Sequence, residues 1–216
     1  MTLDLMKVYE LLRGRYGDLN WWPADSVFEV MTGAVLTQNT NWNNVEKALG
    51  NFNGELSPEL IENMDEAALR AKIRPAGFFN QKSGYIKALT GWYKGYGYDP
   101  ERVKAGEAGA LRKELLAIKG IGRETADSIM LYAFGFPEFV VDAYTMRLLE
   151  RHGEPPRSYE TVKAAFQAAL PKEPYLYNNC HAAIVINAKE HCRKQRPLCE
   201  SCPLNILRKD SSLCSK

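Results

Sequence analysis

The chain has 216 residues, of which 45% are hydrophobic and 25% are charged. These are ordinary globular values, and they exclude a disordered, collagen-like or coiled-coil chain. The formal net charge is +2, from 28 Lys and Arg against 26 Asp and Glu. This falls short of the strongly basic balance of an electrostatic nucleic-acid binder, so composition alone neither requires nor excludes DNA.

The first part of the chain reads as a helix followed by a turn. Leu5, Val8, Leu12 and Tyr16 recur at spacings of three and four residues, which places them on one face of a helix. Gly17 follows, where glycine commonly caps a helix C-terminus. No stretch of the sequence approaches the roughly 20 apolar residues needed to cross a bilayer. This segment also lacks the uninterrupted apolar core of a signal peptide.

Helix start signals continue along the chain. Ser26 and Glu29 form a capping box that opens a helix beginning SVFEVM. Ser57-Pro58-Glu59 combines a capping serine, a proline at the first helical position and an acid in the first turn. Further helices are predicted at 80–94, 108–118, 123–134, 143–152, 159–169 and 176–190. No segment shows the period-2 alternation of a strand, so the sequence predicts an all-α fold.

A glycine-rich turn separates the predicted helices at 108–118 and 123–134. Residues 115–126 read LLAIKGIGRETA, so that one helix ends near Lys119 and the next starts near Arg123. Gly120 and Gly122 allow positive φ and let a phosphate approach the backbone closely. The N–H groups that open the second helix can then face that phosphate. Many helical hairpins use glycine only to turn, so this motif alone does not establish a binding site.

The cysteines are concentrated at the end of the chain. Four of the five lie in the last 25 residues, with the spacing Cys192-x6-Cys199-x2-Cys202-x11-Cys214. In a cytosolic chain such clustering indicates a metal or cluster site rather than disulfides. The fifth, Cys180, opens the apolar run CHAAIVI and reads as a small buried residue.

These features occur together and in order. The stretch IKGIGRETADSIMLYAFGFPEFVVDAYTMR, with the cysteine tail, resembles the helix-hairpin-helix DNA glycosylases related to endonuclease III. In that family a hairpin of this kind is followed, after one helix and a short loop, by an aspartate in a VD motif, and Asp142 occupies that position. The resemblance implies that Gly120, Ile121, Gly122 and Arg123 form a DNA-binding hairpin.

The resemblance makes Asp142 the expected catalytic residue. Its plain role is to cap the helix AYTMRLLERHG, and a carboxylate at a helix start can also stabilise an oxocarbenium-like sugar or activate a water at its anomeric carbon. Bifunctional members of the family carry a lysine two residues after the last hairpin glycine, where it forms a Schiff base with the sugar. Glu124 stands there in this chain, and a carboxylate cannot form an imine. We therefore expect no Schiff-base lyase activity.

The cysteine tail matches the beginning of the endonuclease III iron–sulfur motif. The resemblance implies a 4Fe–4S cluster held by Cys192, Cys199, Cys202 and Cys214, although the last interval is longer than the family usually shows. Zinc is the alternative, because four cysteines also suit it. The cluster is expected to be structural, and the basic residues between Cys192 and Cys199 are expected to face phosphates.

Three further sequence motifs narrow the resemblance to one branch of the superfamily. Trp21-Trp22-Pro23, VLTQNTNW at 35–42 and RPAGFFNQK at 74–82 look like the 3-methyladenine glycosylase branch of the superfamily. By the same resemblance Trp21, Trp22, Pro23 and Trp42 frame the base pocket, although tryptophans fill cores more often than they bind ligands. Gln38 is expected to enter the duplex and fill the gap left by the flipped nucleotide. The best-known members of that branch lack the cysteine cluster that this chain keeps.

The architecture implied by the resemblance is two helical subdomains that flank a DNA-binding cleft. Residues 26–134 are expected to form a six-helix barrel that carries the hairpin at 115–126. Residues 1–25 and 135–216 are expected to form the second subdomain, with the cluster loop at 192–214. Asp142 and the hairpin then face each other across the cleft.

The function implied is that of a monofunctional base-excision-repair glycosylase. It is expected to flip a damaged base out of duplex DNA and to hydrolyse the N-glycosidic bond of an alkylated purine such as 3-methyladenine. We expect a monomer that acts on double-stranded DNA in the cytoplasm, at the nucleoid if the source is bacterial, without membrane association.

Three alternatives remain open from the sequence. The same fold could serve a glycosylase for oxidised, deaminated or mismatched bases. A non-catalytic module could use the hairpin only to bind the DNA backbone. The cluster could instead serve electron transfer, but that function would not explain the tryptophan-containing motifs or the glycine hairpin.

Overall fold

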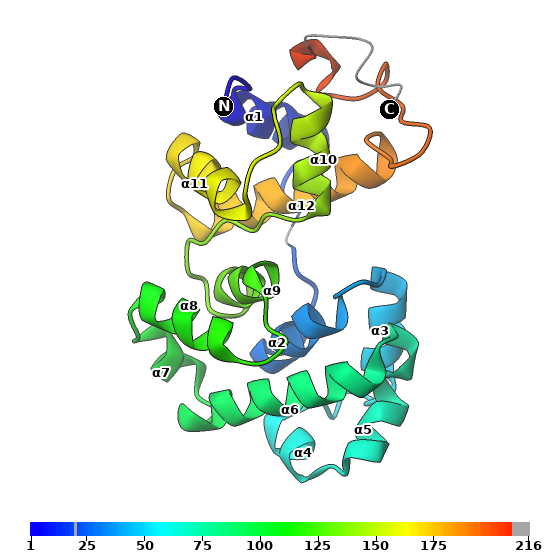
Figure 1. Ribbon diagram of the computed structural model, residues 1–216, viewed down its shortest axis with the longest axis vertical. Coiled ribbons are helices and arrows are strands. Elements are labelled where there is room, and N and C mark those ends of the chain that lie inside the picture. Colours follow the sequence, from blue (N-terminus) through cyan, green and yellow to red (C-terminus); the bar gives the residue numbers. More distant parts are fainter. Residues whose placement is uncertain (20, 209–216) are drawn as a thin grey trace. The chain divides into compact units, whose positions relative to one another are not determined.

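The computed structural model describes residues 1–19 and 21–208, and their regular secondary structure is helical throughout, with no strand among them (Figure 1). The prediction of an all-α fold is confirmed. The elements are α1 (Leu5–Tyr16), α2 (Val27–Leu36), α3 (Trp42–Gly50), α4 (Pro58–Asn63), α5 (Glu66–Ile73), η1 (Arg74–Ala76), α6 (Phe79–Gly95), α7 (Pro100–Lys104), α8 (Ala108–Ala117), α9 (Arg123–Ser128), η2 (Ile129–Ala133), α10 (Ala143–Arg151), α11 (Tyr159–Ala169), α12 (Pro174–Glu190) and η3 (Asn205–Leu207).

The capping residues read from the sequence act as predicted. The Ser26 Oγ accepts from the Glu29 N–H at 3.1 Å, and the Ser57 Oγ accepts from the Leu60 N–H at the same distance. Gly17 has φ +70° and donates its N–H to the Arg13 carbonyl at 2.8 Å. Each cap pairs a backbone group that the end of a helix would otherwise leave without an intrahelical partner.

Two parts of the helix prediction were wrong in detail. The expected helix at 123–134 is α-helical only in α9 and continues as the π-helical turn η2. The helices α3, α5 and α7 were not predicted, although Asn41, Asp65 and Asp99 cap their first turns. Their short apolar faces give too weak a period to stand out without the caps.

Contacts within the chain define two compact units. The central unit is Trp22–Phe136, which carries α2 to α9 and η2. The terminal unit combines Met1–Trp21 with the described residues from Pro137 onward, and it carries α1 and α10 to α12. Segments from both ends of the chain therefore build one unit.

The central unit is organised around the 17-residue helix α6, which packs against α2, α4 and α5. Its core is one continuous cluster of buried apolar side chains, and Met31, Phe52, Ile61, Leu69 and Ile86 in it are at most 1% exposed. Burial of this kind is the main stabilising contribution to such a unit.

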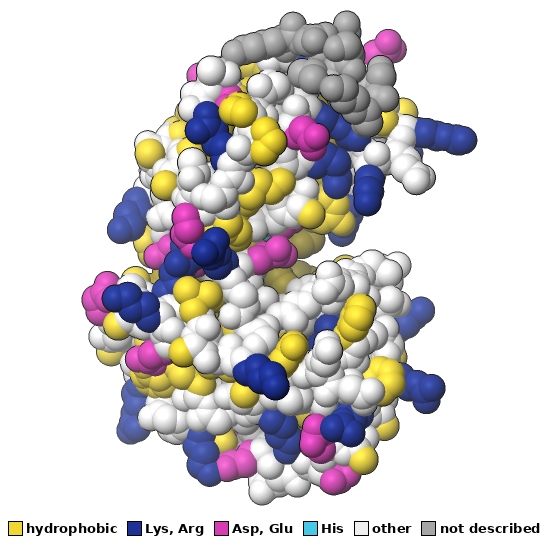
Figure 2. Space-filling view, viewed as in Figure 1, with side chains coloured by type: hydrophobic (Ala, Val, Ile, Leu, Met, Phe, Trp, Pro, Cys, Tyr) yellow, Lys and Arg dark blue, Asp and Glu magenta, His cyan; other side chains and the backbone are white. Residues whose placement is uncertain are grey.

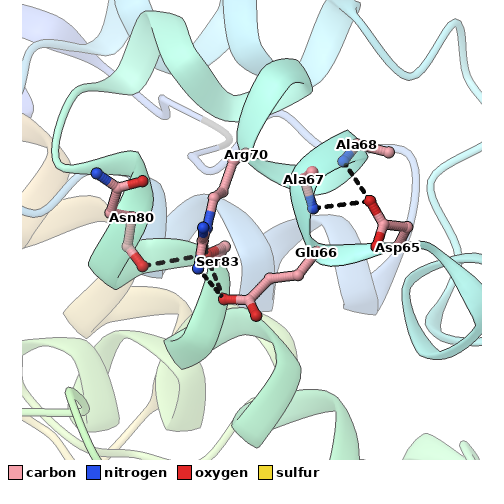
Figure 3. Close-up of polar contacts among 7 residues, drawn as sticks. All are labelled: Asp65, Glu66, Ala67, Ala68, Arg70, Asn80 and Ser83. Carbon is pink, nitrogen blue, oxygen red and sulfur yellow. Dashed lines mark hydrogen bonds and ion pairs between the residues drawn. The ribbon is translucent and has the colours of Figure 1, made fainter.

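A polar contact group joins α5 to α6 at the surface (Figure 3). Asp65 caps α5 by accepting from two backbone N–H groups, those of Ala67 and Ala68. One turn further, the Arg70 Nη2 lies 2.6 Å from the Glu66 Oε1, and the hydroxyl of Ser83 on α6 reaches the same carboxylate oxygen at 3.4 Å. The Glu66–Arg70 pair is exposed, and surface pairs of this type contribute little free energy. The buried Ser83 hydroxyl is the group that links α6 to this pair.

The terminal unit has its own aromatic core. The Phe139 ring stacks on the Phe166 ring of α11 with centroids 4.2 Å apart, and it meets the Tyr177 ring of α12 edge-on at 5.6 Å. Helix α1 packs along α12. The first residues are fixed by Glu154, whose Oε1 accepts from the backbone N–H groups of Thr2 and Leu3 at 2.5 and 2.6 Å.

Glu154 gives this unit a pH-dependent stability. Although burial raises its pKa, the hydrogen bonds from Thr2 and Leu3 outweigh burial, and the net pKa is lowered. The stabilisation is therefore complete above the ordinary glutamate pKa and is lost as the pH falls through the lowered value. We expect Glu154→Gln to cost about 1–3 kcal/mol at pH 7 and to flatten the fall of melting temperature between pH 5 and pH 3. An unchanged acid profile would contradict this role.

The described residues contain no helix that is both long and apolar enough to cross a membrane. On the face of the central unit shown in Figure 2, Lys and Arg side chains are interspersed with Asp and Glu and do not gather into one stripe. This distribution agrees with the small net charge of the chain.

Candidate functional site

The glycine-rich turn forms the loop of a helix-hairpin-helix between α8 and α9. Gly122 is the N-terminal cap residue of α9, and Gly122 and Arg123 are exposed. Ile121, by contrast, is only 4% exposed, and its side chain belongs to the core of the central unit. The loop therefore offers solvent its backbone and the Arg123 side chain, while Ile121 anchors it.

Gly120 is required by the geometry of this loop. Its φ is +88°, and a Cβ at this position would lie 2.3 Å from ring atoms of Tyr85 on α6. Both facts exclude a side chain, since positive φ disfavours L-residues and no real Cβ contact is so short. The Tyr85 ring thus packs directly on the hairpin backbone.

We expect Gly120→Ala to lower the free energy of unfolding by about 2–4 kcal/mol, from left-handed strain and overpacking together. Gly91→Ala on α6 is the matched control, because a Cβ there meets nothing within 4 Å. Urea unfolding of both variants measures the difference. Equal stabilities would show that Tyr85 and the loop move apart without cost.

Gln38 holds the hairpin from the segment after α2. Its Nε2 donates to the Gly120 carbonyl at 2.9 Å and to the Thr125 hydroxyl at 3.0 Å. The side chain is half-buried. The structure therefore brings together two regions that the sequence analysis singled out separately, the LTQNT segment and the hairpin.

Two hollows open on this part of the central unit. One of about 340 Å³ and one of about 210 Å³ share Gln38, Asn39 and Gly120 in their walls. Glu124, the residue at the position of the family's lysine, lines the larger one. The other lining residues are Ala34, Thr37, Gly122, Thr125 and Ser128 in the larger hollow and Phe78, Gln81, Lys82 and Tyr85 in the smaller.

The wall of the smaller hollow contains Phe78, which the sequence analysis did not single out. Phe78 is 60% exposed and has φ +48°, a left-handed conformation that is unusual for an aromatic residue. The signal available in the sequence was that Phe78 belongs to the motif RPAGFFNQK, but the motif does not indicate whether its side chain is exposed. A strained, exposed aromatic beside a polar hollow is a candidate contact for a base.

Lys82, the last residue of the same word, fixes this wall from inside. It is 2% exposed, and its Nζ donates to the carbonyls of Leu36 and Ala76 at 2.8 and 2.9 Å, at the ends of α2 and η1. Burial lowers the pKa of its ammonium group to about 8. Its amine is therefore engaged by backbone and positions the segments that carry Gln38 and Phe78.

The two hairpin helices are joined by a buried ion pair. Arg112 on α8 donates from Nε and Nη2 to the two carboxylate oxygens of Asp127 on α9, at 2.7 and 3.1 Å. The Asp127 side chain is fully buried and that of Arg112 is 19% exposed. This two-bond geometry fixes the orientation of one helix against the other.

Three of the four residues expected to frame a base pocket lie together in the central unit, and the fourth, Trp21, belongs to the terminal unit. Trp22 and Trp42 meet edge to face, with ring centroids 5.1 Å apart, and Pro23 and Trp42 line a hollow of about 300 Å³ in the central unit. Trp21 belongs to the terminal unit, where its carbonyl accepts from Asn178 and its ring lies 6.0 Å from the Lys189 Nζ. Trp22 also packs on Tyr132, with centroids 5.2 Å apart, as a core residue does.

Carboxylates line the same hollow. Asp25, Glu29 and Glu46 are in its wall, and the Trp42 Nε1 donates to the Glu46 Oε1 at 2.8 Å. Burial and the neighbouring Asp25 charge raise the pKa of Glu29. The hollow thus combines an aromatic face with negative charge, which suits a cationic, planar group.

Asp142 lies at the N-terminus of α10 in the terminal unit. Its Oδ1 accepts from the Thr145 N–H at 2.7 Å and from the Thr145 hydroxyl at 2.9 Å, so the predicted cap is present. Its Oδ2 lies 3.4 Å from the Nε2 of His181 on α12. Burial raises the pKa of Asp142, but His181 and the Thr145 hydrogen bonds outweigh burial and lower it overall. The carboxyl group is therefore ionised at neutral pH.

His181 is the second residue that the sequence analysis missed. It is 6% exposed and stands between Cys180 and Ala182, both fully buried. The signal was a lone histidine inside the apolar run CHAAIVI, which by itself is more typical of a core residue. Its link to Asp142 depends on the packing of α10 against α12.

Three of the expected cluster ligands line one cavity. Cys192, Cys199 and Cys202 share its wall with the buried residues Arg151, His152 and Leu204 and with Arg208. The buried Arg151 donates from Nη1 to the Cys192 Sγ at 3.3 Å, a contact that suits a thiolate. Cys214 lies outside the described residues. Within the described part of the chain, no three His, Cys, Asp or Glu side chains are grouped closely enough to hold a metal ion.

The donor chemistry nevertheless fits an iron–sulfur cluster. Thiolate sulfurs are soft ligands, and the three cysteines line a common cavity with a buried guanidinium beside Cys192. Cys192 and Cys202 are free in this structure, whereas Cys199 is disulfide-bonded and must be reduced before it can bind a cluster. Cys180 takes no part, since it is fully buried in α12 and burial raises the pKa of its thiol.

Comparison with known proteins identifies the family. The model of the HhH-GPD superfamily of base excision DNA repair proteins matches residues 32–172, which include the hairpin and Asp142. The chain belongs to this superfamily. It is therefore a DNA glycosylase of base excision repair, and DNA is its partner.

Individual members of the HhH-GPD superfamily resemble the chain over most of its length. A Methanocaldococcus jannaschii protein, provisionally named as a DNA repair glycosylase, is 45% identical over 206 residues that cover 93% of each chain. The crystal structure of the H. pylori 3-methyladenine DNA glycosylase bound to 1,N6-ethenoadenine is 28% identical, with a TM-score of 0.78 over 87% of this chain and 98% of that one. A trapped endonuclease III–DNA covalent intermediate is 24% identical, with a TM-score of 0.81 over 98% and 97% of the two chains. This last likeness shows the fold.

Proposed function

We propose that the protein is a monofunctional DNA glycosylase that hydrolyses the N-glycosidic bond of alkylated purines of the 3-methyladenine type in duplex DNA. The observation that carries the proposal is the identity of Glu124. It lines the larger hollow at the position where bifunctional members carry a lysine. The buried lysine nearby, Lys82, donates to two carbonyls. Neither residue supplies an exposed amine for a Schiff base.

The preference for an alkylated purine rests on three supports. The chain shares the WWP, LTQNT and RP-G-F-NQK words with the 3-methyladenine branch, and it is similar to the H. pylori enzyme of that name. Pro23 and Trp42 line a hollow that also carries three carboxylates, and a methylated purine is planar and cationic. N-methylation also weakens the glycosidic bond, so that little general acid catalysis is needed.

In the proposed mechanism the hairpin binds the DNA backbone and Gln38 enters the duplex where the damaged nucleotide has left. Gln38 must then release the Gly120 carbonyl and the Thr125 hydroxyl that it binds in this structure. The ionised Asp142 stabilises positive charge on the sugar or activates a water at its anomeric carbon. The product is an abasic site in an unbroken strand, and the protein acts as a monomer.

We further propose that Cys192, Cys199, Cys202 and Cys214 hold a 4Fe–4S cluster. Such a cluster cross-links the C-terminal segment through its cysteine–iron bonds and so stabilises a tail that has little hydrophobic core of its own. Visible absorption and iron and zinc analysis of the purified protein distinguish the cluster from a zinc site. A colourless protein with one zinc per chain would favour zinc.

The test is base release from methylated duplex DNA, with separation of the released bases and inspection of the strands before alkali treatment. Release of 3-methyladenine without strand breaks and without trapping by borohydride is expected. Strand breaks or a borohydride-trapped adduct would contradict the monofunctional assignment. No release of alkylated bases would contradict the substrate.

A second candidate substrate class has support of its own. The chain keeps the cysteine tail, and it is 28% identical to the Sulfolobus acidocaldarius endonuclease III over 183 residues. Duplexes with oxidised, deaminated or mismatched bases therefore form the second arm of the same assay. Silence in both arms would favour a non-catalytic DNA-binding module.

A further inference from the structure

The two oxygens of Asp142 have different partners. Oδ1 accepts both hydrogen bonds from Thr145, and the one from the backbone N–H is the bond that caps α10. Oδ2 lies 3.4 Å from the His181 Nε2, on a different helix. A helix cap needs one side-chain oxygen, so the approach of His181 has no role in capping.

The surroundings make a partner for Oδ2 necessary. The side chains of Asp142 and His181 are 10% and 8% exposed, and their neighbours in sequence, Val141 and Cys180, are buried and apolar. A carboxylate removed from water without compensating contacts favours its protonated form. A protonated Asp142 could neither stabilise a cationic sugar nor accept a proton from water.

We propose that His181 is a positioning residue that holds the Asp142 carboxylate ionised and oriented through Oδ2, with Thr145 holding Oδ1. The proposal rests on the proposed catalytic role of Asp142. The imidazole Nε2 lies 3.4 Å from Oδ2, within ion-pair distance, and helix α12 carries it. The carboxylate plane is then set from two helices, α10 and α12, before substrate binds. His181 itself does not touch the substrate.

The experiment compares His181→Phe, His181→Gln and Cys180→Ala, alone and in the Asp142→Asn background. Phenylalanine keeps a ring without the polar contact, and glutamine places an amide N–H where Nε2 lies. Cys180→Ala is the matched control, because Cys180 is the buried neighbour on the same helix. Each variant is measured for single-turnover base release and for affinity to a duplex with an uncleavable abasic-site analogue.

We expect His181→Phe to slow base release about 10- to 100-fold, the effect of losing one polar contact to a buried charge, with DNA affinity unchanged. His181→Gln should recover most of the rate, and Cys180→Ala should retain it. In the Asp142→Asn background His181→Phe should have no further effect, because the two residues act as one unit.

Several outcomes would overturn the proposal. One is a base-release rate for His181→Phe that equals the rate for Cys180→Ala. Another is a loss of rate caused by His181→Phe that is as large in the Asp142→Asn background as in the wild type. Failure of glutamine to restore rate, together with lower DNA affinity, would assign His181 a purely structural role. Full activity of Asp142→Asn would instead remove the catalytic role on which the proposal rests. An inactive Asp142→Asn with a fully active His181→Phe would leave the proposed function intact and exclude only the positioning role.

Discussion

Asp142→Asn is expected to slow base release by about 10²- to 10⁴-fold, the range for loss of a group that acts on the reacting bond. The fold should survive, because asparagine caps a helix as well as aspartate does. The amide oxygen can still accept from the Thr145 N–H, as Oδ1 does here at 2.7 Å. What is lost is the negative charge that the sugar needs as the base departs.

The measurement is single-turnover base release by the two proteins, with affinity for an uncleavable abasic duplex and melting temperature alongside. Asp65→Asn is a matched control, because Asp65 caps α5 in the same manner on the surface of the central unit (Figure 3). It should be fully active. A drop in rate for Asp142→Asn with an equal drop in melting temperature would instead attribute the loss to unfolding.

The helical framework was predictable because its signals are local. Ser26, Ser57 and Gly17 act within one turn of where they stand, and the structure places each as a cap. The cap of α10 by Asp142 is local in the same sense. The π-helical turn η2 was not predictable, because the spacing of apolar residues in DSIMLYAF does not distinguish a π-helix from an α-helix.

The contacts that shape the site are not local, and the sequence analysis missed them for that reason. His181 lies 39 positions from Asp142, and only the packing of α10 on α12 brings them together. Phe78 is exposed and Lys82 is buried although they are four positions apart, and one of the two carbonyls that Lys82 binds belongs to the distant residue Leu36. Trp21 and Trp22 are adjacent in the chain but belong to different units, which no periodicity indicates.

The second large effect is expected at the ion pair that joins the hairpin helices. Asp127→Ala leaves the Arg112 guanidinium without the carboxylate that receives its Nε and Nη2. Breaking a buried pair by removing one partner typically costs 3–5 kcal/mol. Arg112 keeps 19% exposure and can turn partly to water, so we expect about 3 kcal/mol, measured by urea unfolding.

The matched control is the double replacement of Arg112 by Met and Asp127 by Leu. Apolar residues of similar volume often restore the stability that a broken pair loses, because no charge is left buried. If the pair serves only stability, the double variant should bind DNA like the wild type. If its two-bond geometry sets the angle between α8 and α9, DNA affinity should stay low although the free energy of unfolding recovers. We expect the second result, because Gln38 and Tyr85 hold the Gly120 loop and the start of α9 from outside the hairpin, whereas the ion pair joins α8 to α9 directly.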